Sequence, residues 1–189
     1  MGNDDFNLSI GPQIDDLAND VLDKKELAEI DLLNKKLMPK KTWAGAITRL
    51  REVVKDGPKR PVYYIGLYLQ DLPENTRSVV FYAGSYIDCL MKHVSNEKGK
   101  NVARALFTSL KYNIKWTKEV LGTELVDILN RYETFVYTPA KHDYEEREGR
   151  PHLFSSKEAV TVCFITMKLA KQLINLSEEA KNYSLNKYY

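Results

Sequence analysis

Side chains that can carry out acid–base or phosphate chemistry gather in one segment, residues 131–152 (RYETFVYTPAKHDYEEREGRPH). It holds two of the three histidines, three arginines and, from residue 143 on, four carboxylates, and its two prolines interrupt a smooth helix. A histidine can exchange a proton near neutral pH, and an arginine can stabilise developing charge on a phosphate. The residues are His142, His152, Arg131, Arg147, Arg150, Asp143, Glu145, Glu146 and Glu148.

Two functional interpretations of this segment remain open, beside that of an ordinary charged connection whose histidines bond to backbone. In the first, His152 is the acid–base group and Arg147 the phosphate stabiliser of a metal-independent endoribonuclease. In the second, the segment binds a partner or a nucleotide without chemistry, through Lys141, His142 and Tyr144, with Tyr132, Phe135 and Tyr137 as docking aromatics. The histidines and carboxylates match no helical HExxH arrangement, so no metal site is predicted.

A second candidate surface is a row of basic residues on a predicted helix over 101–120. At roughly 100° per residue they fall within roughly a 60° arc. Tyr112 and Trp116 lie on one flank of this arc. Such a row with neighbouring aromatics is typical of a nucleic-acid surface, and also of a solvated helix face. This 104–118 stripe consists of Arg104, Lys111, Lys115 and Lys118.

The charge of the chain is unevenly distributed, although its net value is only +2. Residues 1–34 carry nine acidic groups against two lysines, a net charge of −7. Residues 35–118 carry seventeen basic groups against six acidic ones, a net charge of +11. This polarity predicts either that the acidic segment covers a basic surface or that the basic part meets a polyanion.

The elements that must position these residues are predicted to be helices. Apolar residues at helical spacing indicate a helix or helix pair ending at Pro39, then helices from Thr42, from Asn75 or Thr76, over 101–120 and from Thr123. Ser155 and Glu158 form a capping box before another helix, and Ser177 begins a short terminal one. The segment 61–72 is the one place where a strand is tempting; we read it as irregular or helical.

These elements predict an all-α fold, a bundle of about five to seven helices. The domain prediction is an acidic helical arm over 1–40 and a helical bundle over 41–189. No run approaches the roughly 18 apolar residues that cross a bilayer, and the acidic N-terminus lacks the order of a signal peptide. We therefore expect a cytoplasmic protein with no membrane contact and no cofactor. Cys89 and Cys163 are expected to be small core residues.

Residues 79–175 resemble the HEPN superfamily of helical bundles. The segments that carry the resemblance are FYAGSYIDCLMKHV, LNRYETFVYTPAKHDY and RPHLFSSKEAVTVCFITMKLA. The resemblance implies a helical bundle from a prokaryotic defence or toxin–antitoxin setting, with a homodimer, RNA and an antitoxin-like protein as partners. Catalytic members cut RNA without metal through an R-x4-6-H motif, often with two copies meeting across a dimer, whereas many other members are inactive binding modules.

Arg147 and His152 fit the spacing of that motif. They depart from its usual position near a helix start, because Pro151 favours extended backbone before it and the capping box begins only at Ser155. Our leading hypothesis is therefore a HEPN-like binding or regulatory module associated with RNA or a nucleotide. The alternative is the metal-independent endoribonuclease that uses this Arg–His pair.

Overall fold

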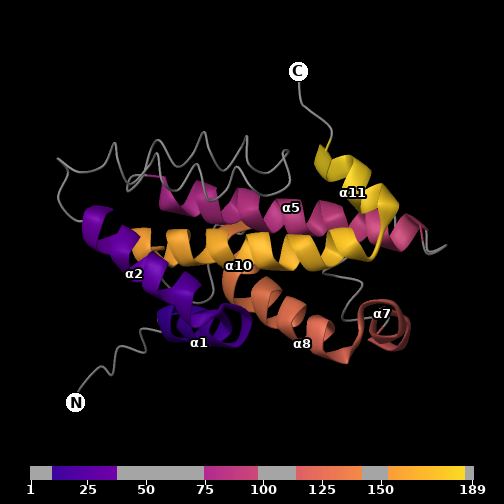
Figure 1. The fold of residues 1–189 in the computed structure, drawn as a ribbon, viewed down its shortest axis with the longest axis horizontal. Coiled ribbons are helices and arrows are strands. Elements are labelled where there is room, and N and C mark those ends of the chain that lie inside the picture. The colour runs from indigo at the N-terminus through magenta and orange to yellow at the C-terminus, as the bar shows by residue number, and fades with distance from the viewer. Residues whose placement is uncertain (1–9, 38–74, 98–113, 142–152, 186–189) are drawn as a thin grey trace, which may run out of the picture.

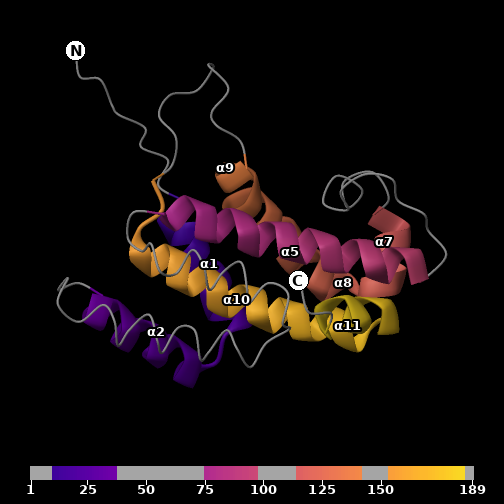
Figure 2. The same cartoon turned by 90° about the horizontal axis from the view of Figure 1, so that it is seen from above.

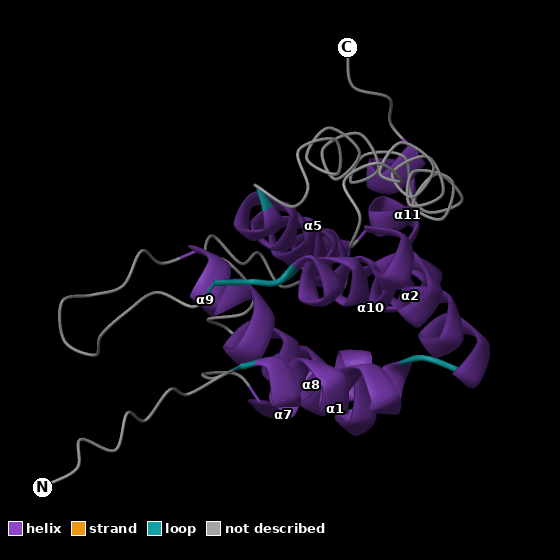
Figure 3. Ribbon diagram, turned by 90° about the vertical axis from the view of Figure 1, so that its left-hand side faces the viewer, coloured by secondary structure: helices purple, strands orange, loops and turns teal. Residues whose placement is uncertain are grey.

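The computed structural model describes residues 10–37, 75–97, 114–141 and 153–185, and these ranges are helical, with no strand among them (Figure 3). The prediction of an all-α fold is confirmed. The helix expected from Thr42, the segment 61–72 and the predicted domain boundary at residue 40 all lie outside the described residues. In the part that the structure describes, no helix is both long enough and apolar enough to span a bilayer.

Two long helices, α5 (Thr76–Glu97) and α10 (Ser156–Asn175), lie side by side at the centre of the molecule (Figures 1 and 2). Apolar residues at helical spacing make their interface, and α10 is buried around most of its circumference. The interface and core residues of the pair include Val79, Ile87, Leu90, Val162, Ile165 and Leu169, none of them exposed. This pair is the frame on which the other helices rest.

The predicted capping box starts α10. The backbone N–H of Glu158 donates to Ser155 Oγ at 3.1 Å, and the backbone N–H of Ser155 donates to Glu158 Oε2 at 2.6 Å. These two bonds satisfy backbone donors that have no partner inside the helix, so the helix start is fixed by local chemistry.

A continuous helical segment crosses the pair: α8 (Thr123–Tyr132), the π-helix η3 (Glu133–Tyr137) and α9 (Thr138–Lys141). The expectation that a loop follows the helix ending near Tyr132 is therefore wrong for residues 133–141. A proline at position 139 cannot bond to the carbonyl of residue 135, and its ring would clash with that carbonyl in a regular helix. The wider π turn just before Pro139 accommodates the ring, and the chain remains helical because this stretch is buried against α5.

A short helix, α7 (Ile114–Leu121), precedes α8. Gly122 ends it with φ +83°, a conformation that favours glycine, and α8 begins at Thr123 as predicted. The remainder of the helix expected over 101–120 lies outside the described residues.

The N-terminal residues form a helix pair, α1 (Gly11–Val21) and α2 (Lys24–Leu37), that packs on α10 of its own bundle (Figure 2). Leu22 is extended between them, and Asp23 and Glu26 bond reciprocally through side chain and backbone at 2.8–2.9 Å. This second capping box starts α2. The apolar residues Ile14, Leu17, Leu22, Ile30 and Leu33 join the common core.

The last helix, α11 (Glu178–Leu185), lies against the C-terminal ends of α5 and α10. The hydroxyl of Ser177 accepts the backbone N–H of Ala180 at 3.1 Å, which confirms Ser177 as the start of this helix. Glu97 of α5 accepts bonds from the Ser177 hydroxyl and the Glu179 backbone N–H, at 2.6 and 2.8 Å. A side chain of α5 therefore caps the start of α11.

Candidate functional site

Most of the predicted site residues lie outside the part of the chain that the structure describes. Arg147, His152, His142 and Tyr144 fall in residues 142–152, and Arg104 and Lys111 in residues 98–113. Lys115 lies in α7, without a described side chain. The described geometry therefore concerns Lys118, Lys141 and the helices on both sides of segment 142–152. The Arg147–His152 pair stays a prediction.

The N-terminal end of this loop is fixed to α5. Arg77 Nε donates to the carbonyl of Ala140 at 3.1 Å, which ties the last turn of α9 to the start of α5. Lys141 Nζ lies 5.4 Å from the centroid of the Tyr137 ring. A cation within about 6 Å of an aromatic ring is attracted to its face, so the Lys141 ammonium group is held at the point where the loop begins.

Tyr137 itself is wedged against α5 at Gly84. A Cβ atom built on Gly84 would lie 2.7 Å from Tyr137 Cγ and 2.9 Å from Tyr137 Cβ, far inside van der Waals contact. Only glycine allows this approach. The ring also stacks on Phe81, with centroids 6.1 Å apart and planes at 28°.

The phenol of Tyr137 interacts with polar side chains of α5. Burial raises its pKa, a hydrogen bond with the Ser85 side chain opposes this rise, and the negative charge of Asp88 adds to it. Asp88 is itself only 6% exposed. The phenol therefore stays protonated at neutral pH and acts as a structural hydrogen-bonding group, not as a base.

The structure corrects the predicted role of two docking aromatics. Tyr132 is fully buried, and its hydroxyl lies 2.6 Å from Thr166 Oγ1 of α10. Tyr137 is 6% exposed. Both rings pack in the core because the helix continues past residue 132, and its buried face carries both side chains. Phe135 is partly exposed, so among these three it alone offers accessible ring surface.

Arg131 of α8 forms an ion pair with the acidic arm and is not part of a reactive cluster. Its Nη2 lies 2.6 Å from Asp20 Oδ2 of α1, in an ion pair on the surface. Lys157 and Lys168 of α10 likewise pair with carboxylates at the start of and within α2. Residues 1–34 therefore pair with basic side chains of their own chain, but these three partners lie outside residues 35–118, so a cover over that basic part stays a prediction.

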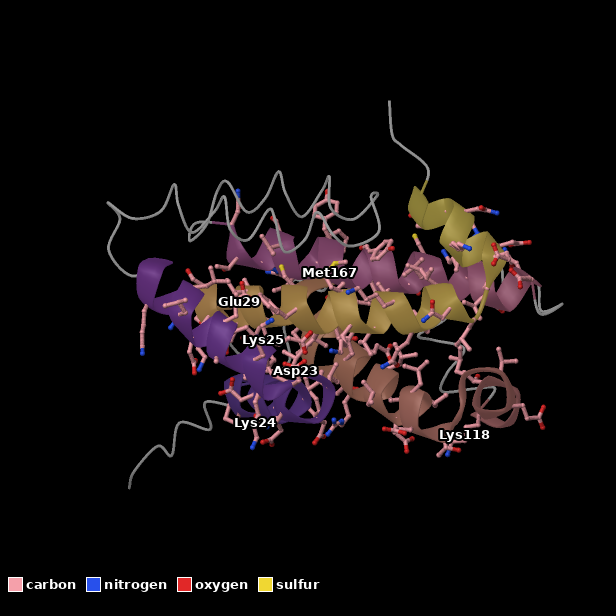
Figure 4. The ribbon with its side chains drawn as sticks, in the orientation of Figure 1. Asp23, Lys24, Lys25, Glu29, Lys118 and Met167 are labelled. Atoms are coloured by element: carbon pink, nitrogen blue, oxygen red, sulfur yellow. The ribbon has the colours of Figure 1, made fainter. Side chains whose placement is uncertain are left out.

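Lys118 is the one residue of the 104–118 stripe whose side chain the structure describes. Thr117 is fully buried and Leu121 is 8% exposed, so α7 turns that side toward the core, and Lys118 beside them is partly buried. Figure 4 places Lys118 toward the α7 end of the molecule, away from Asp23 at the start of α2. The contacts of the acidic arm reported above do not include Lys118.

The loop root and α7 stand at opposite ends of the helical segment Thr123–Lys141 (Figure 2). At 1.5 Å per residue this segment is about 28 Å long. Lys118 and Lys141 are therefore too far apart to hold one small ligand within a single chain.

The remaining reactive side chains have structural positions. The His93 ring lies 4.5 Å from the Tyr183 ring, and its Nδ1 is 3.8 Å from Glu179 Oε2, so it joins α5 to α11. Cys163 is buried, as expected, and burial raises the pKa of its thiol to about 12. Cys89 is only partly buried. Within the described ranges, no three His, Cys, Asp or Glu side chains are placed to hold a metal ion.

The cluster around Tyr137 could hardly be predicted from local sequence patterns. A glycine inside the apolar helix 76–97 was its one visible signal, because an isolated helical glycine often marks a close approach. Comparison of the chain with protein-family models, with curated proteins and with solved structures found no match.

Proposed function

We propose that this protein is a HEPN-like helical binding or regulatory module that binds RNA through the loop 142–152 and its root. The carrying observation is the position of Lys141. Its ammonium group lies over Tyr137, and Gly84 lets Tyr137 wedge into α5. A cation on a rigid support loses little freedom when it meets a phosphate, which favours binding. His142 and Tyr144 follow directly in the sequence.

The other end of the loop is equally well supported. Phe154 is buried, and the Ser155–Glu158 capping box follows at once. The helices on both sides of the segment that carries Arg147 and His152 are therefore packed in the bundle. Binding and catalytic groups are commonly placed in this way, on a loop that a rigid scaffold presents.

The 104–118 stripe is proposed as a second contact for the same RNA. Because α7 and the loop root are about 28 Å apart along the connecting helix, a mononucleotide cannot reach both. An extended polynucleotide can, and so can two chains in the proposed homodimer. An antitoxin-like protein partner would compete for either surface.

The test is the salt dependence of RNA affinity. We expect Lys141→Gln to weaken binding of a labelled single-stranded RNA and to lower the slope of log affinity against log salt by about one. The matched control is Lys24→Gln, which removes an exposed lysine from α2. Equal affinity and slope in wild type and Lys141→Gln would remove the loop root from the proposed interface.

The alternative function, metal-independent cleavage of RNA, rests on the placement of Arg147 and His152 on one short connection with both ends held. The test is incubation of RNA with the protein in EDTA. Cleavage that disappears in His152→Ala, but persists in His142→Ala, would support the pair. Cleavage unchanged by His152→Ala would overturn it, and no cleavage at all leaves the binding module as the function.

A further inference from the structure

Three lysines form a row on the outer side of α10: Lys157, Lys168 and Lys171. At roughly 100° per residue they lie within roughly a 60° arc, as a basic helix face that follows a phosphate backbone would. Lys171 is exposed, whereas Lys157 and Lys168 are partly covered. We call these three residues the α10 lysine row.

The acidic residues of α2 neutralise two members of this row. Lys168 Nζ lies 3.0 Å from both carboxylate oxygens of Glu26 and 3.9 Å from Asp23 Oδ2. Lys157 Nζ lies 3.6 Å from Asp31 Oδ1. The carboxylates thus repeat along α2 opposite the lysines, in the place that the phosphates of a bound polyanion would take.

The attachment of α2 is lighter than that of α1. The fully buried apolar contacts of α2 are Ile30 and Leu33, and its substantial contact among the described elements is with α10. In contrast, α1 contacts α10, α8 and η3. The extended Leu22, whose side chain is buried, separates the two helices, so α1 and α2 make their contacts as distinct elements.

We propose that α2 is an acidic cover over the α10 lysine row, and that this row binds the phosphate backbone of single-stranded RNA when α2 lifts. Ion pairs between partly exposed side chains are individually weak and are screened by salt, so a polyanion can compete with them. The α10 lysine row is distinct from the loop 142–152 and from the 104–118 stripe. RNA affinity therefore depends on the position of α2, a form of regulation that the proposed function does not include.

The first test removes the negative charge of the cover and keeps both hydrogen bonds of the capping box that starts α2. The triple variant Asp23→Asn/Glu26→Gln/Asp31→Asn keeps side chains that cap a helix start. Its control, Asp15→Asn/Asp16→Asn/Asp127→Asn, changes the net charge equally at exposed positions of α1 and α8. At low salt we expect the triple variant to bind labelled single-stranded RNA roughly threefold to tenfold tighter than wild type, and the control to change much less.

The second test identifies the surface that becomes accessible. Adding Lys157→Gln/Lys168→Gln/Lys171→Gln to the triple variant should remove the gain in affinity. Amide hydrogen exchange of wild-type protein should become faster over residues 24–37 when RNA is added, and stay unchanged over residues 11–21. A gain that persists without the three lysines, a gain of equal size in the charge control, or slower exchange of α2 with RNA would each overturn the cover.

These outcomes are separate from the fate of the proposed function. If the triple variant binds RNA no more tightly than wild type, the cover is overturned, whether or not Lys141→Gln weakens binding. If the triple variant gains affinity while Lys141→Gln has no effect, the cover stands and the loop function is overturned.

Discussion

The central pair of α5 and α10 carries two attachments of opposite kind. On one side, η3 is held by shape and burial: Val136 is fully buried and the Tyr137 ring packs directly over Gly84. On the other side, α2 combines a small apolar contact, made by Ile30 and Leu33, with ion pairs of Lys157 and Lys168 in which the side chains stay partly exposed.

The difference concerns how firmly each attachment is fixed. A buried close contact has one geometry and does not respond to salt, whereas exposed ion pairs are weak and adjustable. The proposed binding loop leaves from the rigid attachment, and the proposed cover is the adjustable one. Both assignments follow from the chemistry that holds each element to the same central pair.

The strongest way to break the comparison is to fill the space at Gly84. Because the new methyl group would overlap the Tyr137 ring, we expect Gly84→Ala to lower the free energy of unfolding by about 2–3 kcal/mol, measured by urea denaturation. In a Tyr137→Ala background the ring is gone and only the 2.9 Å approach between the two Cβ atoms remains, so the same change should cost clearly less. An equal loss in both backgrounds would contradict the wedge.

The second prediction concerns alkaline pH, at which the buried thiol and phenol groups of the core lose their stabilising contribution. Burial raises the pKa of the Cys163 thiol to about 12 and also raises the pKa of the Tyr132 phenol, so both stay neutral in the fold. Their contribution is complete below the ordinary pKa values and is lost as pH rises toward the raised ones. We expect the free energy of unfolding to fall by about 1.4 kcal/mol per pH unit for each group that ionises in the unfolded chain.

Urea denaturation between about pH 8 and about pH 11 measures this loss. In Cys163→Ala the thiol no longer contributes, so the decline should begin at higher pH, where tyrosine ionises. A decline of the same onset and steepness in wild type and Cys163→Ala would assign the effect to other groups.

The third prediction concerns the hydrogen bond between Tyr132 and Thr166. The Thr166 hydroxyl donates to the Val162 carbonyl at 2.6 Å, so the Tyr132 phenol is the donor to Thr166. We expect Tyr132→Phe to lower the free energy of unfolding by about 1 kcal/mol. Thr166→Val should cost more, about 2 kcal/mol, because it deprives the buried phenol of this acceptor. The reverse order would show that the bond contributes little.

The smallest expected effect on the free energy of unfolding concerns the ion pairs between α10 and α2. Lys168→Gln should lower the free energy of unfolding by less than about 1 kcal/mol, and the difference should vanish in high salt. Lys171→Gln is the matched control on the same face of α10. A salt-independent loss in Lys168→Gln would mean that Lys168 acts through packing.

Local features of the fold could be predicted from the sequence. Ser155 and Glu158 lie three residues apart and Gly122 adopts a backbone conformation that few other residues tolerate, so each marks its helix boundary without help from distant residues. The extent of the helix over residues 76–97 follows equally from the spacing of its apolar residues.

The π-helix could not be predicted in this way. Pro139 and the charged residues after it indicate a loop, and the helix continues only because the buried face of residues 132–140 packs against α5 and α10. Likewise, the partner of Arg131 is Asp20, 111 residues away, and no local pattern connects them. Interactions between residues so distant in sequence exist only once the helices have packed.

The sequence by itself therefore determined the all-α class, the helix caps and the positions where reactive side chains concentrate, because these depend on neighbours a few residues apart. The tertiary structure decided which of these groups are engaged. In the folded chain Tyr132 and Tyr137 are buried in the core, and Arg131 forms an ion pair with the acidic arm. Lys141 lies over the Tyr137 ring, next to segment 142–152. Burial and pairing are properties of surfaces that meet, and those surfaces are assembled from distant parts of the chain.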